Sequence, residues 1–505
     1  MSIAEIPAPF LLEYPPLVSA LLPIIGRSEA YLVGGAVRDA LLRRPSHDLD
    51  LATPEDGRRL AKRIANALQG DYYALDPERG VGRAIVTYEG VRYSVDVARF
   101  RGDSLEEDLR GRDFTVNAIA APLRGDLQRL IDPLNGVQDL FDKRLRRCTP
   151  DSIRDDPIRA LRAVRQSVQF KLLIERETRV DLRTHGVNIV HSSPERVRDE
   201  FMTMLGGVKP QAALRALDSL GLLRLIVPEV DAMRGVAQSP PHVYDVWEHT
   251  LNTVERMADV IFTISPQRTE ESAADAALGL IVYLLDAFRA QLQAHLESPL
   301  PNGRSVRALL VLAALLHDSG KPAARSVDED GRIHFYRHEV IGAELAQARA
   351  EALRLSNEET ARLVGCVRHH MRPMHLRNAE SLSRRAVYRF WKATNSSGVD
   401  VCLLTLADYL AMVGAHLQVQ EWLAHLQVVR ALLDAYFNRR EEVVAPPPLI
   451  NGTALMQALN LQPSRIVGQL LEQIAEAQAT GEISTAEEAL ELARRLYTAS
   501  PERDA

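Results

Sequence analysis

Short apolar runs alternate with segments of helical period over the first 140 residues. Tyr31-Leu32-Val33 predicts a buried strand, and the pair Gly34-Gly35 lets the chain turn sharply into a helix over 36–42. In the run Asp48-Leu49-Asp50-Leu51 the period is two, which predicts a strand with both leucines in the core and both carboxylates on the other face. The run from Val91 to Val97 alternates in the same way. We therefore expect strands and helices to be mixed in this part of the chain.

From Pro150 onwards the pattern becomes helical, with charged amphipathic segments to Leu205 and again from Pro210 to Leu225. A chain of 505 residues is too long for one hydrophobic core. We expect a multidomain α+β protein, with a mixed-sheet N-terminal domain followed by mostly helical domains. The predicted boundaries are 1–140, 141–235, 236–440 and 441–505.

The composition, with 46% hydrophobic and 25% charged residues, is that of a soluble protein. No secretory signal is evident at the N-terminus, and the apolar runs at 277–285 and 308–316 are too short to span a bilayer. The three cysteines have neither metal-type spacing nor a disulfide pattern. We expect a cytoplasmic protein with no membrane partner, and the sequence leaves its oligomeric state open.

The net charge of −6 is unevenly distributed. Residues 141–200 hold fourteen Lys or Arg against ten Asp or Glu, a local charge of +4. Phosphate backbones are bound by such local patches, so RNA, if bound, would lie there.

Two carboxylates on one strand face repel each other unless a cation lies between them. Asp48 and Asp50 therefore predict a site for Mg²⁺, a hard ion that prefers oxygen ligands. The turn at Gly34-Gly35 offers free backbone N–H groups to an anion, so together they suggest a site for a metal and a nucleoside triphosphate. Asp96 is the candidate for a third carboxylate, and the alternative is an ordinary solvent-facing Asp.

The combination Gly34-Gly35-x-Val37-Arg38-Asp39 followed by Asp48-x-Asp50 resembles the signature of class II tRNA nucleotidyltransferases and bacterial poly(A) polymerases. The resemblance implies a nucleotidyltransferase head, catalytic carboxylates at Asp48, Asp50 and Asp96, and phosphate contacts from Gly34, Gly35 and Arg38. It also implies tRNA, CTP and ATP as substrates.

The run Arg110-Gly111-Arg112-Asp113-Phe114-Thr115-Val116-Asn117 resembles the second motif of this family, which is associated with the ribose and triphosphate. Because Gly111 stands where the family has its first Arg, those roles fall to Arg112, Asp113 and Asn117. Asp132-Pro133 with Gly136 matches a short motif joining head to neck, which suits a hinge or an ordinary turn. The connection 101–107 is shorter than is usual in the family, as in enzymes that add only CC.

Asp155-Asp156-Pro157-Ile158-Arg159, continued by Arg162, resembles the Glu-Asp-x-x-Arg motif of the family. The spacing predicts Asp156 and Arg159 on one helix face, where an acceptor and a donor can select the Watson–Crick edge of cytosine or adenine. The alternative is an intrahelical ion pair between them.

Seven residues beyond Pro240-Pro241 follow the order of the HD superfamily of metal-dependent phosphohydrolases, with His317-Asp318-Ser319-Gly320-Lys321-Pro322 resembling its core motif. They are His249, His317, Asp318, His338, His369, His370 and Asp408. The resemblance implies one ion on His249, His317, Asp318 and Asp408, and a second completed by His338 with His369 or His370. Imidazole and carboxylate ligands suit Mn, Fe, Ni, Co or Zn. Other histidines, including His242 and His295, are expected to be ordinary.

These features predict a template-independent RNA nucleotidyltransferase that adds C residues, A residues or both, as CCA or CC, to tRNA 3′ ends. The HD domain (236–440) either hydrolyses phosphoesters or only binds metal, between the helical neck and body (141–235) and the tail (441–505). Two alternatives stay open: a poly(A) polymerase, and an HD phosphohydrolase with an RNA-docking head.

Overall fold

The computed structural model describes residues 5–266, 268, 275–377 and 382–498, and it divides into two compact units. The first comprises the chain up to Glu200 together with Ala216–Leu225, and the second comprises Phe201–Arg215 together with the chain from Ile226 on. Each unit is described by itself below.

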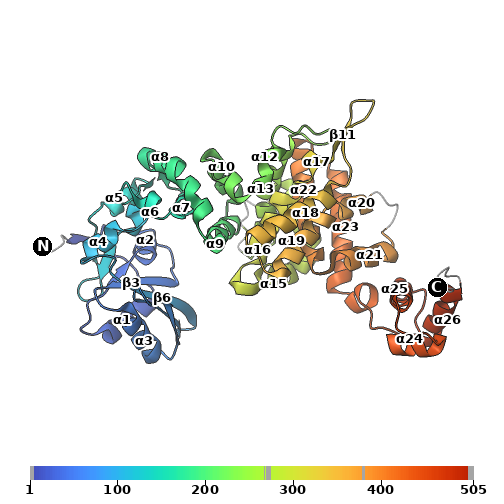
Figure 1. Cartoon of the computed structure of the whole chain (residues 1–505), viewed down its shortest axis with the longest axis horizontal. Helices are drawn as coiled ribbons and strands as arrows, with labels where there is room; N and C mark the ends of the chain where they lie inside the picture. Colours follow the sequence, from blue (N-terminus) through green and yellow to red (C-terminus); the bar gives the residue numbers. More distant parts are fainter. Residues whose placement is uncertain (1–4, 267, 269–274, 378–381, 499–505) are drawn as a thin grey trace. The chain divides into compact units, whose positions relative to one another are not determined.

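An eight-stranded mixed sheet forms the base of the first unit (Figure 1). Only β3 and β6 pair in parallel among its described strands, and the other neighbours are antiparallel. The strands, in their order across the sheet, are β1 Glu5–Pro7, β8 Arg129–Ile131, β7 Ala120–Pro122, β2 Tyr31–Val33, β3 Asp48–Thr53, β6 Val91–Arg99, β5 Val81–Tyr88 and β4 Asp71–Asp76. The expected mixed α+β head is therefore confirmed.

The two faces of the sheet differ as the alternation predicts. Leu49 and Leu51 of β3 and Val95 and Val97 of β6 are buried. Helix α3 (Gly57–Ala67) covers this apolar face, since its Ala61 lies against Gly82 of β5. The carboxylates of β3 and β6 consequently face the opposite way, away from the core.

Short helices follow the sheet in the first unit. They are α1 Pro16–Ile25, α2 Gly35–Leu41, α4 Leu105–Arg110, the 3₁₀ turn η1 Thr115–Asn117, α5 Gly136–Phe141, α6 Ser152–Asp155, α7 Arg159–Phe170, α8 Arg176–His185 and η2 Gly186–His191, with a small parallel pair β9 Arg144–Leu145 and β10 Leu173–Ile174. Helices α9 Pro194–Leu205, α10 Pro210–Ser219 and α11 Leu223–Ile226 each contribute residues to both units.

Asp132 and Gly136 have local roles in the first unit. The carboxylate of Asp132 accepts hydrogen bonds from the backbone N–H groups of Gly136 and Val137, at 2.7 and 2.9 Å, and so caps α5. A Cβ on Gly136 would overlap the carbonyl oxygen of Thr115. These contacts describe a tight turn, and a hinge at this point stays a prediction.

Helices build the second unit, with one small hairpin, β11 Arg325–Val327 and β12 Ile333–Phe335. The helices are α12 Glu229–Met233, α13 Val246–Ile264, α14 Ala276–Leu285, α15 Arg289–Glu297, α16 Val306–Leu316, α17 Lys321–Ala324, α18 His338–Ala352, α19 Asn357–His369, α20 Arg372–Arg377, α21 Arg384–Thr394, α22 Gly398–Val413, α23 Val419–Phe437, α24 Gly452–Leu459, α25 Arg465–Thr480 and α26 Ala486–Thr498. The η8 turn Arg440–Val444 precedes α24.

Helix α22 lies at the centre of this unit, and all its residues are buried. It packs against α13, α16 and α19 (Figure 1). The stretch Arg384–His416, which includes α22, is long and apolar enough by length and composition to cross a membrane, but 89% of its most apolar window is buried in the protein. The sequence-based search for apolar runs overlooked this stretch.

The last three described helices have a hydrophobic cluster of their own, which includes Leu455, Ile474 and Ala489. Ion pairs join α25 to α21, for example Glu476 to Arg389 at 2.7 Å. A helical tail was expected here. Its final residues, 499–505, lie outside the described part of the chain.

Candidate active site

Three carboxylates of the first unit stand in one row on the polar face of the sheet. Asp48 and Asp50 lie two residues apart on β3, and Asp96 of β6 is the register partner of Asp50. All three line a pocket of about 600 Å³. We call Asp48, Asp50 and Asp96 the carboxylate row. The predicted third carboxylate therefore lies beside the other two, although it also forms an ion pair.

That ion pair comes from Arg83 of β5, whose Nε and Nη2 each lie 2.7 Å from a carboxylate oxygen of Asp96. Such a bidentate contact fixes both the position and the rotation of the carboxylate. Sequence analysis missed Arg83, because it faces Asp96 only through the antiparallel pairing of β5 with β6.

The electrostatic environment of the Asp50 carboxylate suits a bound cation. Asp50 is accessible to water through the pocket, but the protein atoms around it desolvate its carboxylate and raise its pKa. Arg112 opposes this shift, whereas Asp96 and Asp48 add to it. Because oxygen ligands and excess negative charge are what Mg²⁺ requires, the donor set suits such an ion.

Gly34 borders the row. It has φ of +70°, in the region that favours glycine, and a Cβ there would lie 3.0 Å from Nη1 of Arg112 and 3.2 Å from Oδ2 of Asp50. Asp108 anchors that arginine, with its Oδ2 3.0 Å from Nη2. Gly35 begins α2, a helix of seven residues. Because a helix this short has only a small dipole, the positive charge of the pocket comes mainly from the guanidinium groups that line it.

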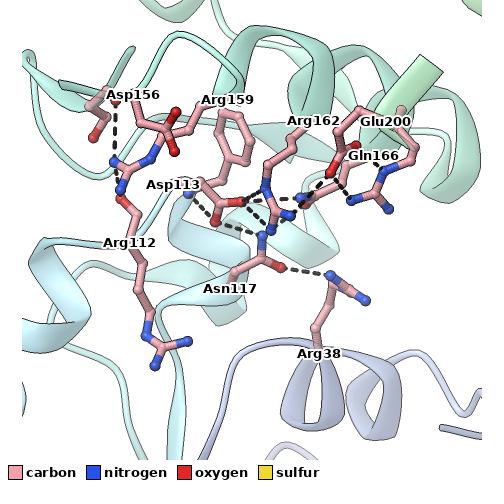
Figure 2. A network of polar contacts seen from close by, with 12 residues as sticks. Arg38, Arg112, Asp113, Asn117, Asp156, Arg159, Arg162, Gln166 and Glu200 are labelled. Atoms are coloured by element: carbon pink, nitrogen blue, oxygen red, sulfur yellow. Dashed lines mark hydrogen bonds and ion pairs between the residues drawn. The ribbon is translucent and has the colours of Figure 1, made fainter. Parts of the chain in front are cut away.

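Asn117 links two parts of the pocket (Figure 2). Its Oδ1 accepts a hydrogen bond of 2.7 Å from Arg38, and its Nδ2 donates to Asp113 at 2.9 Å. The guanidinium of Arg38 also lies over the ring of Phe170, at 4.1 Å from its centroid. The predicted nucleotide-binding residues Arg38, Asp113 and Asn117 therefore form one connected network.

Asp113 is the buried centre of this network (Figure 2). It accepts hydrogen bonds from the backbone N–H of Phe114 at 2.8 Å and from Nε of Arg162 at 2.9 Å. Burial alone would raise the pKa of Asp113, but Arg162 and these donors hold it well below its usual range. Glu200 in turn accepts from Arg162 and Arg165, at 3.3 and 2.7 Å.

Asp156 and Arg159 do not share a helix face, so that prediction was wrong. Helix α6 ends at Asp155, Asp156 is extended with φ of −145° and ψ of 96°, and α7 begins at Arg159. Pro157 explains the break, because a proline ring disfavours helical backbone at the preceding residue and has no N–H to donate.

The two residues instead have separate partners. Asp156 pairs with Arg196 of α9 at 2.7 Å, and Arg159 donates to the carbonyl oxygens of Gly111 at 2.8 Å and Arg112 at 3.1 Å. The intrahelical pair considered as the alternative is thus replaced by two longer-range contacts. Both side chains still line the same pocket as the carboxylate row.

Positive charge predominates around the row. The pocket is lined by five aspartates and by seven arginines, which are Arg38, Arg101, Arg112, Arg159, Arg162, Arg165 and Arg196. This balance suits a polyanion bound together with a cation. The arrangement can hold a triphosphate against the carboxylate row, with Asp156 and Arg159 available to a base.

A second cluster lies in the second unit, where buried His and Asp side chains form two triads. His249, His317 and Asp408 form one, and Asp318, His338 and His370 form the other, with ligand atoms within 4.8 Å of one another in each. Asp318 lies between them: its Oδ2 is 3.2 Å from Nε2 of His317, and its Oδ1 is 3.5 Å from Nε2 of His338. Asp318 therefore presents one carboxylate oxygen to each triad, and the two triads are the residues that would hold metal ions.

Hydrogen bonds to backbone carbonyls orient three of these imidazoles. Nδ1 of His317, His338 and His370 lies 2.7 or 2.8 Å from a carbonyl oxygen three residues earlier. A carbonyl only accepts, so each Nδ1 carries the hydrogen and the neutral ring directs its Nε2 lone pair into the cluster. Nε2 of His338 and Nε2 of His370 are 3.3 Å apart. Two lone pairs facing each other at this distance require a cation, so the residues fit metal ions.

The pKa values of these histidines differ. Burial alone would lower the pKa of His317, but Asp318 and Asp408 raise it to about 10, so His317 takes a second proton on Nε2, and a metal ion would have to displace this proton. Burial lowers the pKa of His370 to about 3, which keeps its imidazole neutral.

His369 was one of two candidates for the second ion, and the structure leaves it outside both triads. Its Nδ1 accepts a hydrogen bond of 3.1 Å from Arg372. Adjacent residues on a helix point about 100° apart, so only one of the pair can face the cluster, and this is His370.

His242, expected to be an ordinary histidine, borders the cluster with its ring 5.2 Å from that of His249. Lys321 lies beside it, with Nζ 2.7 Å from Oδ2 of Asp318. The core motif includes Lys321 but assigns it no role, and His242 has no sequence signal because it follows Pro240-Pro241 in an irregular segment.

Comparison with known proteins matches several family models. They are "Poly A polymerase head domain" at residues 30–146, "Probable RNA and SrmB- binding site of polymerase A" at 171–234, "HD domain" at 280–413, and a "tRNA nucleotidyltransferase domain 2" model at 351–493.

Two relatives are similar to this chain over nearly their whole length. The A-adding tRNA nucleotidyltransferase of Deinococcus radiodurans is 33% identical over 94% of this chain and 96% of its own length. The CC-adding tRNA nucleotidyltransferase of Thermus thermophilus is 32% identical over 92% of this chain and 93% of its own. This chain therefore belongs to the tRNA nucleotidyltransferase family with a poly(A) polymerase head and an HD domain. It is a nucleotidyltransferase, and the poly(A) polymerase and phosphohydrolase alternatives are not favoured.

Solved structures agree on the fold. A CCA-adding enzyme with ATP superimposes with a TM-score of 0.60 at 19% identity, over 95% of this chain and 96% of that one. A Thermotoga maritima CCA-adding enzyme with tRNA has a TM-score of 0.54 at 20% identity, over 95% and 96% of the two chains.

Proposed function

We propose that this chain adds C residues, A residues or both, as CCA or CC, to the 3′ end of tRNA from CTP and ATP, releasing pyrophosphate. The observation that supports this most directly is the carboxylate row standing in a pocket lined by seven arginines. Relatives named for A addition and for CC addition have nearly equal identity, so they do not separate these products.

Mg²⁺ bound at the row would lower the pKa of the RNA 3′-hydroxyl and neutralise the triphosphate. Asp48 and Asp50 supply its oxygen ligands in this proposal, and Asp96, held by Arg83, adds negative charge beside them. Arg112 and Arg38 would bind the phosphates.

Asp113 and Asn117 would keep the ribose and the arginines in place. Asp156 would accept from the exocyclic amine of cytosine or adenine, and Arg159 would donate to ring acceptors, so uracil and guanine offer the wrong pattern.

The connection 101–107 favours CC addition. It is short and tied at both ends: the N–H of Asp103 donates to Glu107 at 2.7 Å, and Arg101 donates to the carbonyl of Gly111 at 2.8 Å. A segment held in this way has little freedom to rearrange the site after the second C.

The experiment extends a tRNA lacking CCA with each nucleoside triphosphate alone and with CTP and ATP together. Addition of two C residues from CTP supports the proposal, and an A after them distinguishes CCA from CC. An unlimited A tract would instead identify a poly(A) polymerase.

Replacing both Asp48 and Asp50 by Ala should abolish extension without loss of folded structure, as followed by circular dichroism. Asp71→Ala, an exposed carboxylate on the edge strand β4, is the matched control and should extend normally. Extension by the double variant would refute the proposal.

Besides nucleotidyl transfer, and not in its place, the two triads suit a second activity, metal-dependent phosphoester hydrolysis in the second unit. A pocket of about 590 Å³ opens on Asp318, His338 and Asp408 and is lined by Lys321, so a phosphate can approach the triads. The HD-type cluster implies a divalent ion, and we propose Mn, Fe, Ni, Co or Zn.

Metal analysis and hydrolysis of 2′,3′-cyclic phosphates test this second proposal. His370→Ala should lose metal and any hydrolysis but keep nucleotide addition, whereas the neighbouring His369→Ala should keep all three. Retention of metal by His370→Ala would exclude the site as described.

We also propose a cytoplasmic location and no membrane partner, together with functional domains at 1–140, 141–235, 236–440 and 441–505. The three free cysteines fit a reducing cytoplasm, and the burial of α22 within the protein fits the lack of a membrane partner.

A further inference from the structure

We infer that a second pocket beside the triads binds one nucleotide of an RNA strand, so that the hydrolysis proposed there acts on the end of an oligonucleotide in preference to a mononucleotide. This inference rests on the proposed second activity. The pocket has a volume of about 620 Å³, within the range of small-ligand sites, and residues of α18, α19, α20 and α21 line it. We call it the side pocket, and we call the pocket that opens on Asp318, His338 and Asp408 the triad pocket.

The side pocket adjoins the triad pocket. Glu339, Met371 and His375 line both of them. His369 lines the side pocket, whereas the next residue, His370, belongs to a triad. Because the Cα atoms of neighbouring residues are only about 3.8 Å apart, one ligand can extend from the triads into the side pocket.

The side pocket has an excess of positive charge. It is lined by one glutamate and by four arginines, which are Arg368, Arg372, Arg385 and Arg389. Arg385 and Arg389 are held by Glu476 of α25, at 3.1 and 2.7 Å. Nε of Arg372 donates to Nδ1 of His369, at 3.1 Å, which does not neutralise the guanidinium charge. Among the described residues neither Arg368 nor Arg372 pairs with a carboxylate, and both are exposed, so an anion can bind them.

Apolar side chains line the same pocket. They include Val340, Met371, Leu376 and the buried Phe390. An inorganic anion needs no such surface, whereas a nucleotide combines a base that has apolar faces with a charged phosphate. The side pocket therefore suits a nucleotide.

The position of the side pocket next to the triads favours an oligonucleotide. A nucleoside 2′,3′-cyclic phosphate has a single phosphate, which the triads would take, and Arg368 and Arg372 would then have no anion. In an oligonucleotide, the phosphodiester before the last nucleotide supplies the second charge. Hydrolysis adds one water to the terminal ester: the water oxygen joins the phosphorus, one P–O bond of the ring breaks, and the released ribose oxygen takes a proton. The internucleotide phosphodiester stays intact and serves only for binding.

The test compares hydrolysis of adenosine 2′,3′-cyclic phosphate with hydrolysis of the dinucleotide ApA ending in a 2′,3′-cyclic phosphate. The unaltered, metal-loaded chain should prefer the dinucleotide in kcat/KM by tenfold or more. Arg368→Ala and Arg372→Ala should each lower this preference about tenfold, which corresponds to ~1.4 kcal/mol. Arg430→Ala is the control, since Arg430 is exposed on α23 and lines neither pocket, and it should keep the preference. Equal kcat/KM for the two compounds, or a preference that both arginine variants keep, would overturn the inference and leave the second activity intact.

A second measurement needs binding but no hydrolysis. A dinucleotide that ends in a 3′-phosphate and has 4-thiouridine as its 5′ nucleotide should photo-crosslink to the segments 368–376 and 383–390. The double variant Arg368→Ala with Arg372→Ala should lose these crosslinks. Crosslinks at these segments, with neither cyclic phosphate hydrolysed, would uphold the side pocket and refute the second activity. Crosslinks confined to other parts of the chain would overturn the inference.

Discussion

Asp113→Asn is the most informative single change to the network of Figure 2. The carboxylate of Asp113 is only 8% exposed and lies 2.9 Å from two nitrogens of Arg162. Asparagine has nearly the same shape but no charge, and its amide N–H₂ replaces one acceptor oxygen. One of the donors that now point at Asp113 would then face another donor.

The expected loss of stability in Asp113→Asn follows from the burial of the ion pair between Asp113 and Arg162. Breaking a buried ion pair by removing one partner costs about 3–5 kcal/mol. Arg162 keeps its contact with Glu200 and its side chain is 38% exposed, so water compensates part of the loss. We therefore expect the lower end, about 3 kcal/mol. With a urea m-value of about 2–3 kcal/mol/M, the unfolding midpoint of the first unit should fall by about 1–1.5 M.

The distribution of tryptophan makes the assay specific to one unit. All three tryptophans, Trp247, Trp391 and Trp422, belong to the second unit. Tryptophan fluorescence therefore follows that unit, whereas far-ultraviolet circular dichroism follows both. The midpoint should shift in circular dichroism but not in fluorescence, and the exposed control Asp71→Asn should shift neither. Equal shifts in both signals, or none, would refute the assignment of Asp113 to the stability of the first unit.

The pH dependence has a definite sign. Because the pKa of Asp113 is lower in the folded than in the unfolded state, its contribution to stability is present above about pH 4, the unfolded value, and is lost as the pH falls through the folded value. The difference in free energy of unfolding between the wild type and Asp113→Asn should therefore be constant near neutral pH and decrease in acid.

Three further changes test other parts of the first unit. Asp50→Asn should raise the urea midpoint in EDTA, because burial and the neighbouring carboxylates raise the pKa of Asp50 and so destabilise its charged form. For the same reason the stability of the wild type should rise as the pH falls toward the pKa of Asp50 in the unfolded chain. Mg²⁺ should stabilise the wild type but not the variant. Gly136→Ala should lower the free energy of unfolding by about 1–3 kcal/mol, since its Cβ would overlap the Thr115 carbonyl. Arg196→Ala should reduce the preference for CTP over UTP about tenfold in kcat/KM, because Asp156 loses the partner that positions it.

Matched variants serve as controls for Gly136→Ala and Arg196→Ala. Gly468 is the fourth residue of α25 and has open space where a Cβ would stand, so Gly468→Ala should stabilise rather than destabilise the protein. Arg179→Ala removes an exposed arginine of α8 and should leave nucleotide preference unchanged. A loss of rate by Arg196→Ala for CTP and UTP alike would mean that Arg196 supports the fold and does not position Asp156.

The sequence by itself determined the features that depend on neighbouring residues. The period of two in β3 and β6 put Leu49 and Val95 in the core and the carboxylates on the other face, because alternate side chains of a strand face opposite ways. The short motifs likewise identified Gly34 and the His317-Asp318 pair. The break at Pro157 also follows from the sequence, since a residue before proline avoids helical backbone, and this local rule overrides the shared helix face that the spacing of Asp156 and Arg159 predicts.

Only the tertiary structure decided which distant side chains meet. Asp50 and Asp96 are partners because β3 pairs in parallel with β6, and Arg83 reaches Asp96 because β5 returns beside it. Sequence periodicity fixes which face a side chain takes but not which strand lies next to it. The choice of His370 over His369 likewise depended on the rotation of α19 against its neighbours, which packing of the whole unit sets.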